Sequence, residues 1–225
     1  MKKIGMIVAV EIDSVLGRYG RPLESETRCG FPVMTYAMGE NRLIAVHTGC
    51  GEIAAAAATA LLIDRYEVEL IVNFGVVGGL TAEMAKTRCC VVEKMVHYDF
   101  DTSQLDPVAP GQYEGYDSVY ISNDPALVER AVQLCPELKK VTCASADKFV
   151  GDRESKARLH SLYSADICEM EAAGIALTCN RAGVPCLMIK AVSDGINGGA
   201  EEFFTELQRV SALCLELTDR IMREI

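Results

Sequence analysis

Short runs of almost wholly apolar residues alternate along this chain with segments of helical character. Residues 3–10 (KIGMIVAV), 68–75 (VELIVNFG) and 184–194 (VPCLMIKAVSD) are such runs, as expected of central strands that are buried on both faces. Strands of this kind need helices on both sides to cover them. The alternation therefore predicts an α/β fold, with a mixed, mostly parallel central sheet and helices on both faces.

The segments between these runs complete the pattern. Residues 31–39 and 41–49, separated by a Glu-Asn turn, predict a hairpin or neighbouring strands. An alanine-rich helix is expected to follow within residues 49–66, after a glycine turn. In the last helix, apolar residues recur at three- and four-residue spacings. They are Phe203, Leu207, Val210, Cys214, Leu217 and Ile221.

Other strands and helices are indicated by shorter signals. Strands are expected within residues 88–100 and 140–146, and a polar-faced helix within residues 151–163. Asp124 is a helix N-cap candidate, and Gly183 is a C-cap candidate.

Length and composition limit the classes of function that are possible. The 225 residues show no linker-like stretch, so a single domain spanning residues 1–225 is expected. A net charge of -10 disfavours nucleic acid and anionic membrane surfaces as partners. The ten cysteines make no C-x-x-C pair, and no signal peptide or membrane span is recognisable. We therefore expect a cytoplasmic protein with no metal, no cofactor and no membrane partner.

In folds with a parallel sheet, ligands gather beyond the carboxyl ends of strands. Four places in the sequence meet this condition: residues 9–14, 75–80, 169–171 and 193–194. Three of them carry carboxylates, which can protonate a leaving group, hold hydroxyls or activate water when their environments separate their pKa values.

Asp194 follows a buried strand, where partial burial would favour the protonated form of a general acid. The alternative is a helix N-cap or an Asx turn, which Ser-Asp-Gly favours strongly. Glu169 and Glu171 flank Met170, and strand alternation would put both glutamates on one face. First-turn acids that complement a helix dipole would look the same.

The glycine turn Asn73–Leu80 would bring bare backbone close to a ligand at Val76 and Gly78. It lacks the lysine and Ser/Thr of a phosphate-binding loop, and its spacing differs from the dinucleotide fingerprint. A dinucleotide-dependent oxidoreductase is therefore disfavoured.

Taken together, these segments resemble the nucleoside phosphorylase/nucleosidase family in order and spacing, over nearly the whole chain. The segments are IGMIVAVEID (4–13), TGCGEIAAAAATALLID (48–64), NFGVVGGL (73–80), EMEAAGIA (169–176) and AVSD (191–194). EMEA followed by SD is the most specific part. Within the family, the chain looks most like 5′-methylthioadenosine/S-adenosylhomocysteine nucleosidases, which the segments 145–150 and 201–204 support.

The resemblance implies a role for each matching residue of the purine-binding half of the site. Asp194 would protonate the purine at N7, and Ser193 would help to orient it. Phe149 would stack on the base, a role for which ordinary core packing is an equal alternative, and Val150 would offer backbone hydrogen bonds to the base edge.

The sugar side of the site would be formed by Glu171, which would bind the ribose hydroxyls, and by Met170, which would pack under the sugar. The water-activating acid of the nucleosidases is a glutamate at the position of Asp13. Aspartate is one methylene shorter, and Glu11 would point differently. We predict that Asp13 orients and deprotonates the water.

Hydrolysis is expected rather than phosphorolysis. The phosphorylases of this family hold phosphate with arginines and with a serine in the glycine turn, where this chain has Asn73 and Val76. Val76 also departs from the nucleosidases, which carry serine there.

The predicted activity is hydrolysis of a purine nucleoside, methylthioadenosine or S-adenosylhomocysteine. A purine nucleoside phosphorylase, a futalosine-type hydrolase and a catalytically weak nucleoside-binding protein remain alternatives. The resemblance also implies a homodimer, in which the loop of residues 101–116 would cover a neighbour's 5′ pocket.

Overall fold

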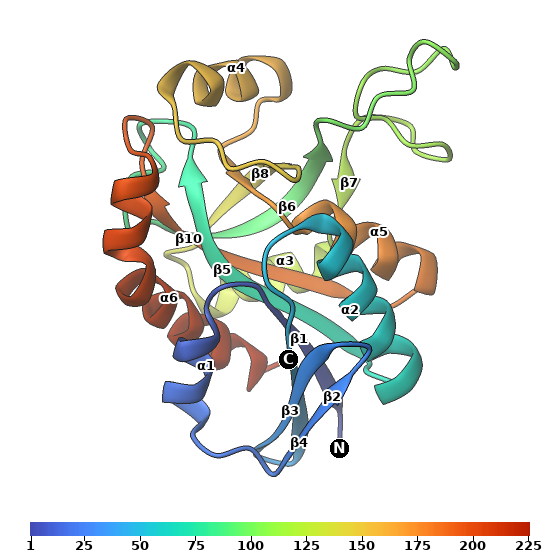
Figure 1. Ribbon diagram of the computed structural model, residues 1–225, viewed down its shortest axis with the longest axis vertical. Coiled ribbons are helices and arrows are strands. Elements are labelled where there is room, and N and C mark those ends of the chain that lie inside the picture. Colours follow the sequence, from blue (N-terminus) through green and yellow to red (C-terminus); the bar gives the residue numbers. More distant parts are fainter.

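The computed structural model describes residues 1–225 as a ten-stranded sheet with helices on both faces (Figure 1). This confirms the predicted α/β class with a mixed sheet. In chain order the elements are β1 (Lys3–Val8), α1 (Ile12–Tyr19), β2 (Glu24–Arg28), β3 (Phe31–Met38), β4 (Asn41–His47), α2 (Glu52–Tyr66), β5 (Leu70–Gly79), β6 (Cys89–His97), β7 (Ile121–Ser122), α3 (Pro125–Leu134), β8 (Lys139–Ser145), α4 (Arg153–Tyr163), β9 (Ile167–Glu169), α5 (Ala172–Ala182), β10 (Cys186–Asp194) and α6 (Ala200–Met222).

The strands follow the order β10-β6-β8-β9-β5-β1-β4-β3-β2, with β7 beside β6. A further parallel pairing joins β10 to β5, so β5, β9, β8, β6 and β10 form a closed ring. Parallel pairs join β1 to both β4 and β5, and β3 and β4 form the predicted antiparallel hairpin. Strand β2 was not anticipated, because all five of its residues are exposed and show no apolar alternation.

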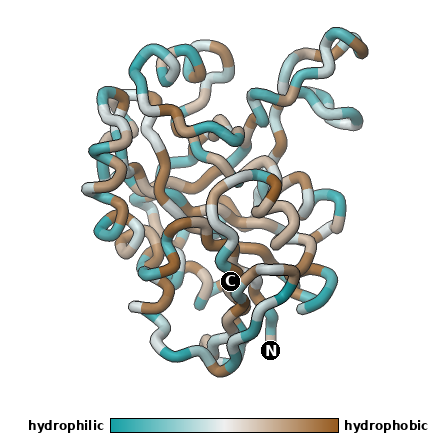
Figure 2. Tube along the Cα trace, in the orientation of Figure 1, coloured by the Kyte–Doolittle hydropathy of each residue, from teal (hydrophilic) through white to brown (hydrophobic).

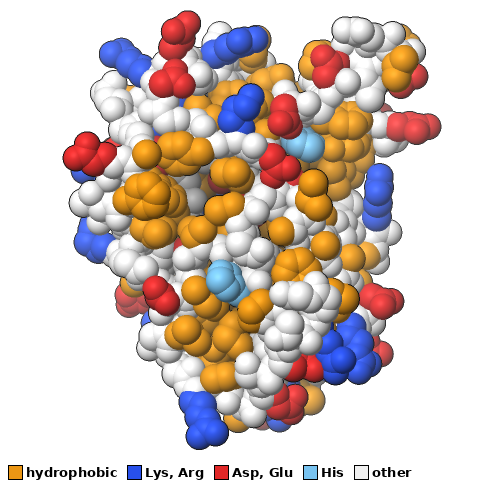
Figure 3. All heavy atoms as spheres, in the orientation of Figure 1, with side chains coloured by type: hydrophobic (Ala, Val, Ile, Leu, Met, Phe, Trp, Pro, Cys, Tyr) orange, Lys and Arg blue, Asp and Glu red, His pale blue; other side chains and the backbone are white.

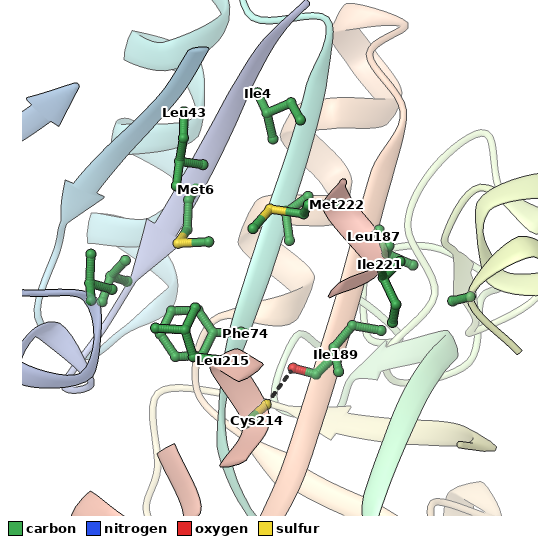
Figure 4. Packing of buried hydrophobic residues seen from close by; sticks show 14 of the residues in the cluster. Ile4, Met6, Leu43, Phe74, Leu187, Ile189, Cys214, Leu215, Ile221 and Met222 are labelled. Carbon is green, nitrogen blue, oxygen red and sulfur yellow. Dashed lines mark hydrogen bonds between the residues drawn. The ribbon is translucent and has the colours of Figure 1, made fainter. Parts of the chain in front are cut away.

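Helices cover each face of the sheet, and each face has its own apolar cluster. Helices α1, α3 and α6 pack on one face, where Phe74 of β5 lies among residues of α6 (Figure 4). There the Cys214 thiol donates a hydrogen bond to the carbonyl oxygen of Ile189, at 3.3 Å. Helices α2 and α5 pack on the other face. Apolar residues accordingly follow the strands through the interior (Figure 2).

Helix α4 lies across one end of the ring, above β5, β6 and β8 (Figure 1). A small third cluster fixes it there, in which Leu159 of α4 packs with Val150, Leu80, Val96 and Ala144. The segment that runs from β8 into α4 therefore covers the carboxyl ends of β5 and β10.

The predicted helix ends are confirmed. The Asp124 carboxylate accepts a hydrogen bond from the backbone N–H of Leu127 at 3.0 Å, and Gly183 ends α5 in the left-handed region at φ 67°. No helix in the structure combines the length and the apolar character that crossing a membrane requires.

Candidate active site

A cavity of about 300 Å³ opens where β1, β5, β9 and β10 end. Figure 3 shows hydrophobic side chains gathered beside a hollow on this face, close to the N-terminal end of α6. Its walls come from segments far apart in the sequence, which the sheet brings to one edge. The lining residues are Ala9, Val10, Glu11, Cys50, Val76, Val77, Gly78, Phe149, Cys168, Glu169, Met170, Glu171, Asp194, Phe203 and Phe204.

Most of the residues singled out from the sequence meet here. Seven of them line the cavity: Asp194, Glu169, Met170, Glu171, Phe149, Val76 and Gly78. Val150 lines a small adjoining cavity of about 30 Å³ together with Phe149 and Asp194. Ser193 lies directly behind Asp194, fully buried. Asp13 is not part of the group.

Asp194 ends β10 and is 1% exposed. The register between β10 and β5 shifts at this point, since Val192 pairs with Val77 and Asp194 with Gly78, leaving Ser193 as the extra residue of a bulge. Such bulges re-aim side chains at strand ends. The Ser193 hydroxyl donates to Oδ1 of Asp194 at 2.9 Å.

Lys156 of α4 was not identified from the sequence. Its ammonium group donates to Oδ2 of Asp194 at 2.6 Å, and its side chain is fully buried. Both bonds to the Asp194 carboxylate thus come from side chains, not from the backbone of a following turn. Helical spacing is the one available signal, because Lys156 lies three residues before the buried Leu159.

Glu169 lies at the centre of a buried polar network. Oε2 accepts a hydrogen bond from Lys190 at 3.1 Å, Oε1 contacts the Ser145 hydroxyl at 2.5 Å, and both oxygens accept from the N–H of Ala172. Burial opposes its ionisation, but the charge of Lys190 and these hydrogen bonds hold the pKa of Glu169 below its ordinary value. Glu169 therefore carries the negative charge that caps α5.

Glu171 is a second buried carboxyl group, and its surroundings shift its pKa in the opposite direction from that of Glu169. Burial, and then the nearby charge of Glu169, raise the pKa of Glu171 to about 8. Its Oε1 accepts a hydrogen bond from the N–H of Gly51 at 3.0 Å. The strand alternation expected through Met170 does not extend this far, because β9 ends at Glu169 and α5 begins at Ala172. All three side chains nevertheless line the cavity.

Glu11, between β1 and α1, is 4% exposed and enters the cavity. Oε1 accepts from the backbone N–H of Val76 at 2.9 Å and Oε2 from that of Val10 at 3.0 Å. Burial raises the pKa of the Glu11 carboxyl. A Cβ atom at Gly75 would lie 2.6 Å from Oε1, so only glycine leaves room for this carboxylate.

Asp13 does not reach this edge of the sheet. It is exposed in the first turn of α1, and Oδ2 accepts a hydrogen bond from the Gln208 amide of α6 at 3.3 Å. Helical geometry is the reason, since two residues along a helix turn the side-chain direction by about 200°. With Glu11 facing inward, Asp13 faces outward.

Three aromatic rings stand at the mouth of the cavity. Phe149 is 46% exposed and meets Phe203 edge to face, at 5.7 Å between ring centroids. Phe203 meets Phe204 in the same way at 5.2 Å, and Phe204 is 73% exposed. Exposed rings of this kind can stack on a planar base. The sequence assigned a role in the site to Phe149 but not to Phe203 or Phe204, and Phe203 was expected only on the apolar face of the last helix.

The model of a family described as the phosphorylase superfamily matches residues 3–225. An aminodeoxyfutalosine nucleosidase of Helicobacter pylori is 29% identical over 219 residues, covering 94% of each chain. A 5′-methylthioadenosine/S-adenosylhomocysteine nucleosidase of Hydrogenovibrio crunogenus is 30% identical over 199 residues, covering 85% of each.

Solved structures show the same relationship. A 5′-methylthioadenosine/S-adenosylhomocysteine nucleosidase of Helicobacter pylori with butyl-thio-DADMe-Immucillin-A superposes with a TM-score of 0.94 at 25% identity, covering 100% of this chain and 99% of that chain. The futalosine hydrolase of the same organism superposes with a TM-score of 0.93 at 25% identity, covering 100% and 98%.

Proposed function

Because the chain belongs to the phosphorylase superfamily, we propose that it is a nucleosidase that hydrolyses the N-glycosidic bond of a purine nucleoside and releases the base. One observation carries the proposal above the others. Three carboxyl groups from three separate segments, those of Glu11, Glu171 and Asp194, converge on one cavity. Breaking a C1′–N9 bond requires a proton for the base, a grip on the ribose and an activated water, and three carboxyl groups in different environments can divide these tasks.

On the base side, Asp194 delivers a proton to N7 as negative charge builds up on the purine. Ser193 holds Oδ1 of the carboxyl group and Lys156 holds Oδ2, which together fix its orientation at the edge of the cavity. The purine stacks on Phe149, and the backbone of Val150 in the adjoining cavity faces its edge. The protonated base is a better leaving group than the anion, which lowers the barrier to bond cleavage.

On the sugar side, Glu171 binds the vicinal hydroxyls of the ribose, and Met170 packs beneath the ring. Glu171 sits beside Gly51, whose N–H keeps its carboxyl oriented toward the cavity. Because its pKa is raised to about 8, the Glu171 carboxyl group is protonated near neutral pH, so it can donate a hydrogen bond to one hydroxyl and accept one from its neighbour.

We assign the attacking water to Glu11 rather than to Asp13. Glu11 is inside the cavity and fixed by two backbone N–H groups, whereas Asp13 faces α6. The two N–H donors hold the carboxylate in one position, and its remaining lone pairs are available to a water molecule. The role that the sequence suggested for position 13 thus passes to position 11.

The place of Glu11 also favours water over phosphate as the nucleophile. The N–H of Val76 lies in β5, which extends through the residues expected to form a glycine turn; an anion could use this donor, but the Glu11 carboxyl group already occupies it. A phosphate here would meet a carboxylate in a buried site, which is unfavourable. Val76 offers no hydroxyl in compensation.

Among nucleosides, we propose methylthioadenosine as the preferred substrate. The cavity lining includes Cys50, Phe203 and Phe204 and contains no arginine or lysine. An uncharged thioether fits such a wall, whereas the carboxylate of a futalosine-type substituent finds no cation there. S-Adenosylhomocysteine, whose amino-acid tail is charged, ranks second.

One assay tests the proposal and its alternatives. The protein is incubated with methylthioadenosine, S-adenosylhomocysteine, aminodeoxyfutalosine, inosine and adenosine, with and without phosphate, and free base and the sugar product are measured. Base release in phosphate-free buffer is expected together with the free sugar, which is 5-methylthioribose when the substrate is methylthioadenosine. A sugar 1-phosphate formed only with phosphate would establish a phosphorylase, and binding without base release would establish a nucleoside-binding protein.

We further propose that the chain works as a homodimer. The loop of residues 101–116 projects from the body of the molecule (Figure 1) and carries Leu105, which is 86% exposed. The ring of Tyr113 in this loop packs internally, because it stacks on Phe100, which directly precedes the loop, at 3.9 Å between ring centroids. A cytoplasmic location stays a prediction.

A further inference from the structure

Lys156 makes three hydrogen bonds in a fully buried position. Its Nζ donates to Asp194 Oδ2 at 2.6 Å, to the carbonyl oxygen of Gly195 at 2.8 Å and to that of Gly198 at 3.1 Å. An ammonium group has three N–H donors and no acceptor. The three acceptors therefore match the charged form, whereas a neutral amine would turn its lone pair against an oxygen atom.

The two hydrogen bonds that Asp194 accepts determine where a proton that it donates can come from. Oδ1 accepts from Ser193 and Oδ2 accepts from Lys156, so both oxygens act as acceptors. A carboxylate that accepts at both oxygens has no proton of its own. Of its two donors, the ammonium is by far the stronger acid, since an aliphatic hydroxyl does not ionise in the physiological range.

We propose that Lys156 supplies the proton that Asp194 passes to the leaving purine, an inference that rests on the proposed function. An Nζ–H bond of Lys156 breaks as an Oδ2–H bond forms on Asp194. That proton then moves to N7 while the C1′–N9 bond breaks and its electron pair goes to the purine. Lys156 is left as a neutral amine, and solvent returns its proton through Asp194 once the base has left. Lys156 does not touch the nucleoside in this scheme, because it acts only through Asp194.

Three titratable groups close to the pair hold their protonation states near neutral pH. Burial raises the pKa of the Cys168 thiol to about 12. On α6, the hydrogen bond from Lys86 holds the pKa of Glu202 below its ordinary value, although burial opposes this. For Glu169 of β9, burial also opposes ionisation, and Lys190 holds its pKa down. The proton that moves is thus one shared by Lys156 and Asp194.

A purely structural role for Lys156 makes a different prediction. Its bonds to Gly195 and Gly198 also hold the loop between β10 and α6. If this were its whole contribution, removing the ammonium would slow the cleavage of every nucleoside alike. A substrate that needs no proton separates the two roles.

The test uses a purine nucleoside that the wild type cleaves and the same nucleoside methylated at N7. The methylated base already carries a positive charge and leaves as a neutral molecule, so it needs no proton. Lys156→Met removes the ammonium and keeps most of the volume. We expect it to lower kcat on the ordinary nucleoside by the ~10²–10⁴-fold typical of lost acid catalysis, and to leave the methylated one within about 3-fold of wild type.

Two further variants complete the design. Lys156→Arg keeps the charge, but a guanidinium does not release its proton at these pH values, so it should repeat the pattern of Lys156→Met. Lys140→Met removes a partly exposed lysine of β8 that pairs with Glu129 and lies outside the cavity lining, and should leave both rates unchanged.

The outcomes distinguish the inference from the proposed function. Equal losses on both nucleosides, or a normal rate of Lys156→Arg on the ordinary nucleoside, overturn the role of Lys156 as proton source. An unchanged rate of Lys156→Met on both does the same. A wild-type chain that releases no base from either nucleoside overturns the proposed function itself.

Discussion

The carboxyl group of Glu11 accepts a hydrogen bond from the backbone N–H of Val76, at 2.9 Å between Oε1 and N. Glu11 follows β1 and Val76 lies in the neighbouring strand β5, so the bond ties two strand ends together across the floor of the cavity. It also places a carboxylate on the donor that an anionic nucleophile would need.

Glu11→Gln should lower the rate of base release by ~10²–10⁴-fold, because the amide cannot accept the proton of the attacking water. Its carbonyl oxygen can still accept the N–H of Val76, so nucleoside binding should persist. Turnover and equilibrium binding are measured in parallel. Asp13→Asn is the matched control, with an exposed side chain, and should retain near-normal turnover. The reverse result, an active Glu11→Gln and an inactive Asp13→Asn, would show that Asp13 activates the water.

Asp194→Asn should lower turnover by a similar ~10²–10⁴-fold while the substrate still binds, since the amide cannot relay a proton to N7. Single-turnover base release, measured with enzyme in excess, separates the chemical step from product release. Near-normal turnover of this variant would mean that another group protonates the purine.

Glu171 should make the folded protein less stable as the pH rises. Its pKa is raised from the ordinary 4.5 to about 8, so between these values the native state binds the proton and the unfolded state does not. Unfolding then becomes easier with increasing pH over this window. Glu171→Gln should therefore flatten the fall in Tm between about pH 5 and pH 8. A Tm–pH curve with the same slope in wild type and variant would contradict the raised pKa of Glu171.

The proposed dimer predicts a sedimentation coefficient of a two-chain particle at micromolar concentration. Leu105→Asp puts a charge at an exposed position of the projecting loop and should shift the equilibrium toward monomer, because a charge buried unpaired in the interface is costly. Leu162→Asp, on an exposed position of α4, is the control and should not change the assembly. A wild-type monomer would rule the dimer out.

The sequence predicted the elements that have strong local signals. Buried strands such as β1, β5 and β10 show near-continuous apolar runs, and the caps Asp124 and Gly183 follow from local backbone chemistry. Strand β2 was missed because an exposed edge strand carries no hydrophobic period.

The site was predictable to the extent that strand ends define it. Asp194 and Glu171 lie in the cavity, as expected from their places after strands, and Phe149 lies there as the family resemblance implied. Two errors of placement have one cause, the side-chain direction at a helix. Glu11 and Asp13 exchange inward and outward positions because α1 begins between them, at Ile12. Lys156 was not predicted because it lies on α4, and only the folded topology brings this helix to the site.

The closed ring of β5, β9, β8, β6 and β10 has a consequence for motion. Every strand of the ring is hydrogen-bonded on both sides, so none of them can slide or peel away without breaking its neighbours. Amide hydrogens in these strands should exchange slowly, and opening should fall on elements with fewer such bonds. The acid at the end of β10 therefore sits on a rigid rim, and we expect any opening of the entrance at the exposed rings of Phe149 and Phe204 rather than at the strands.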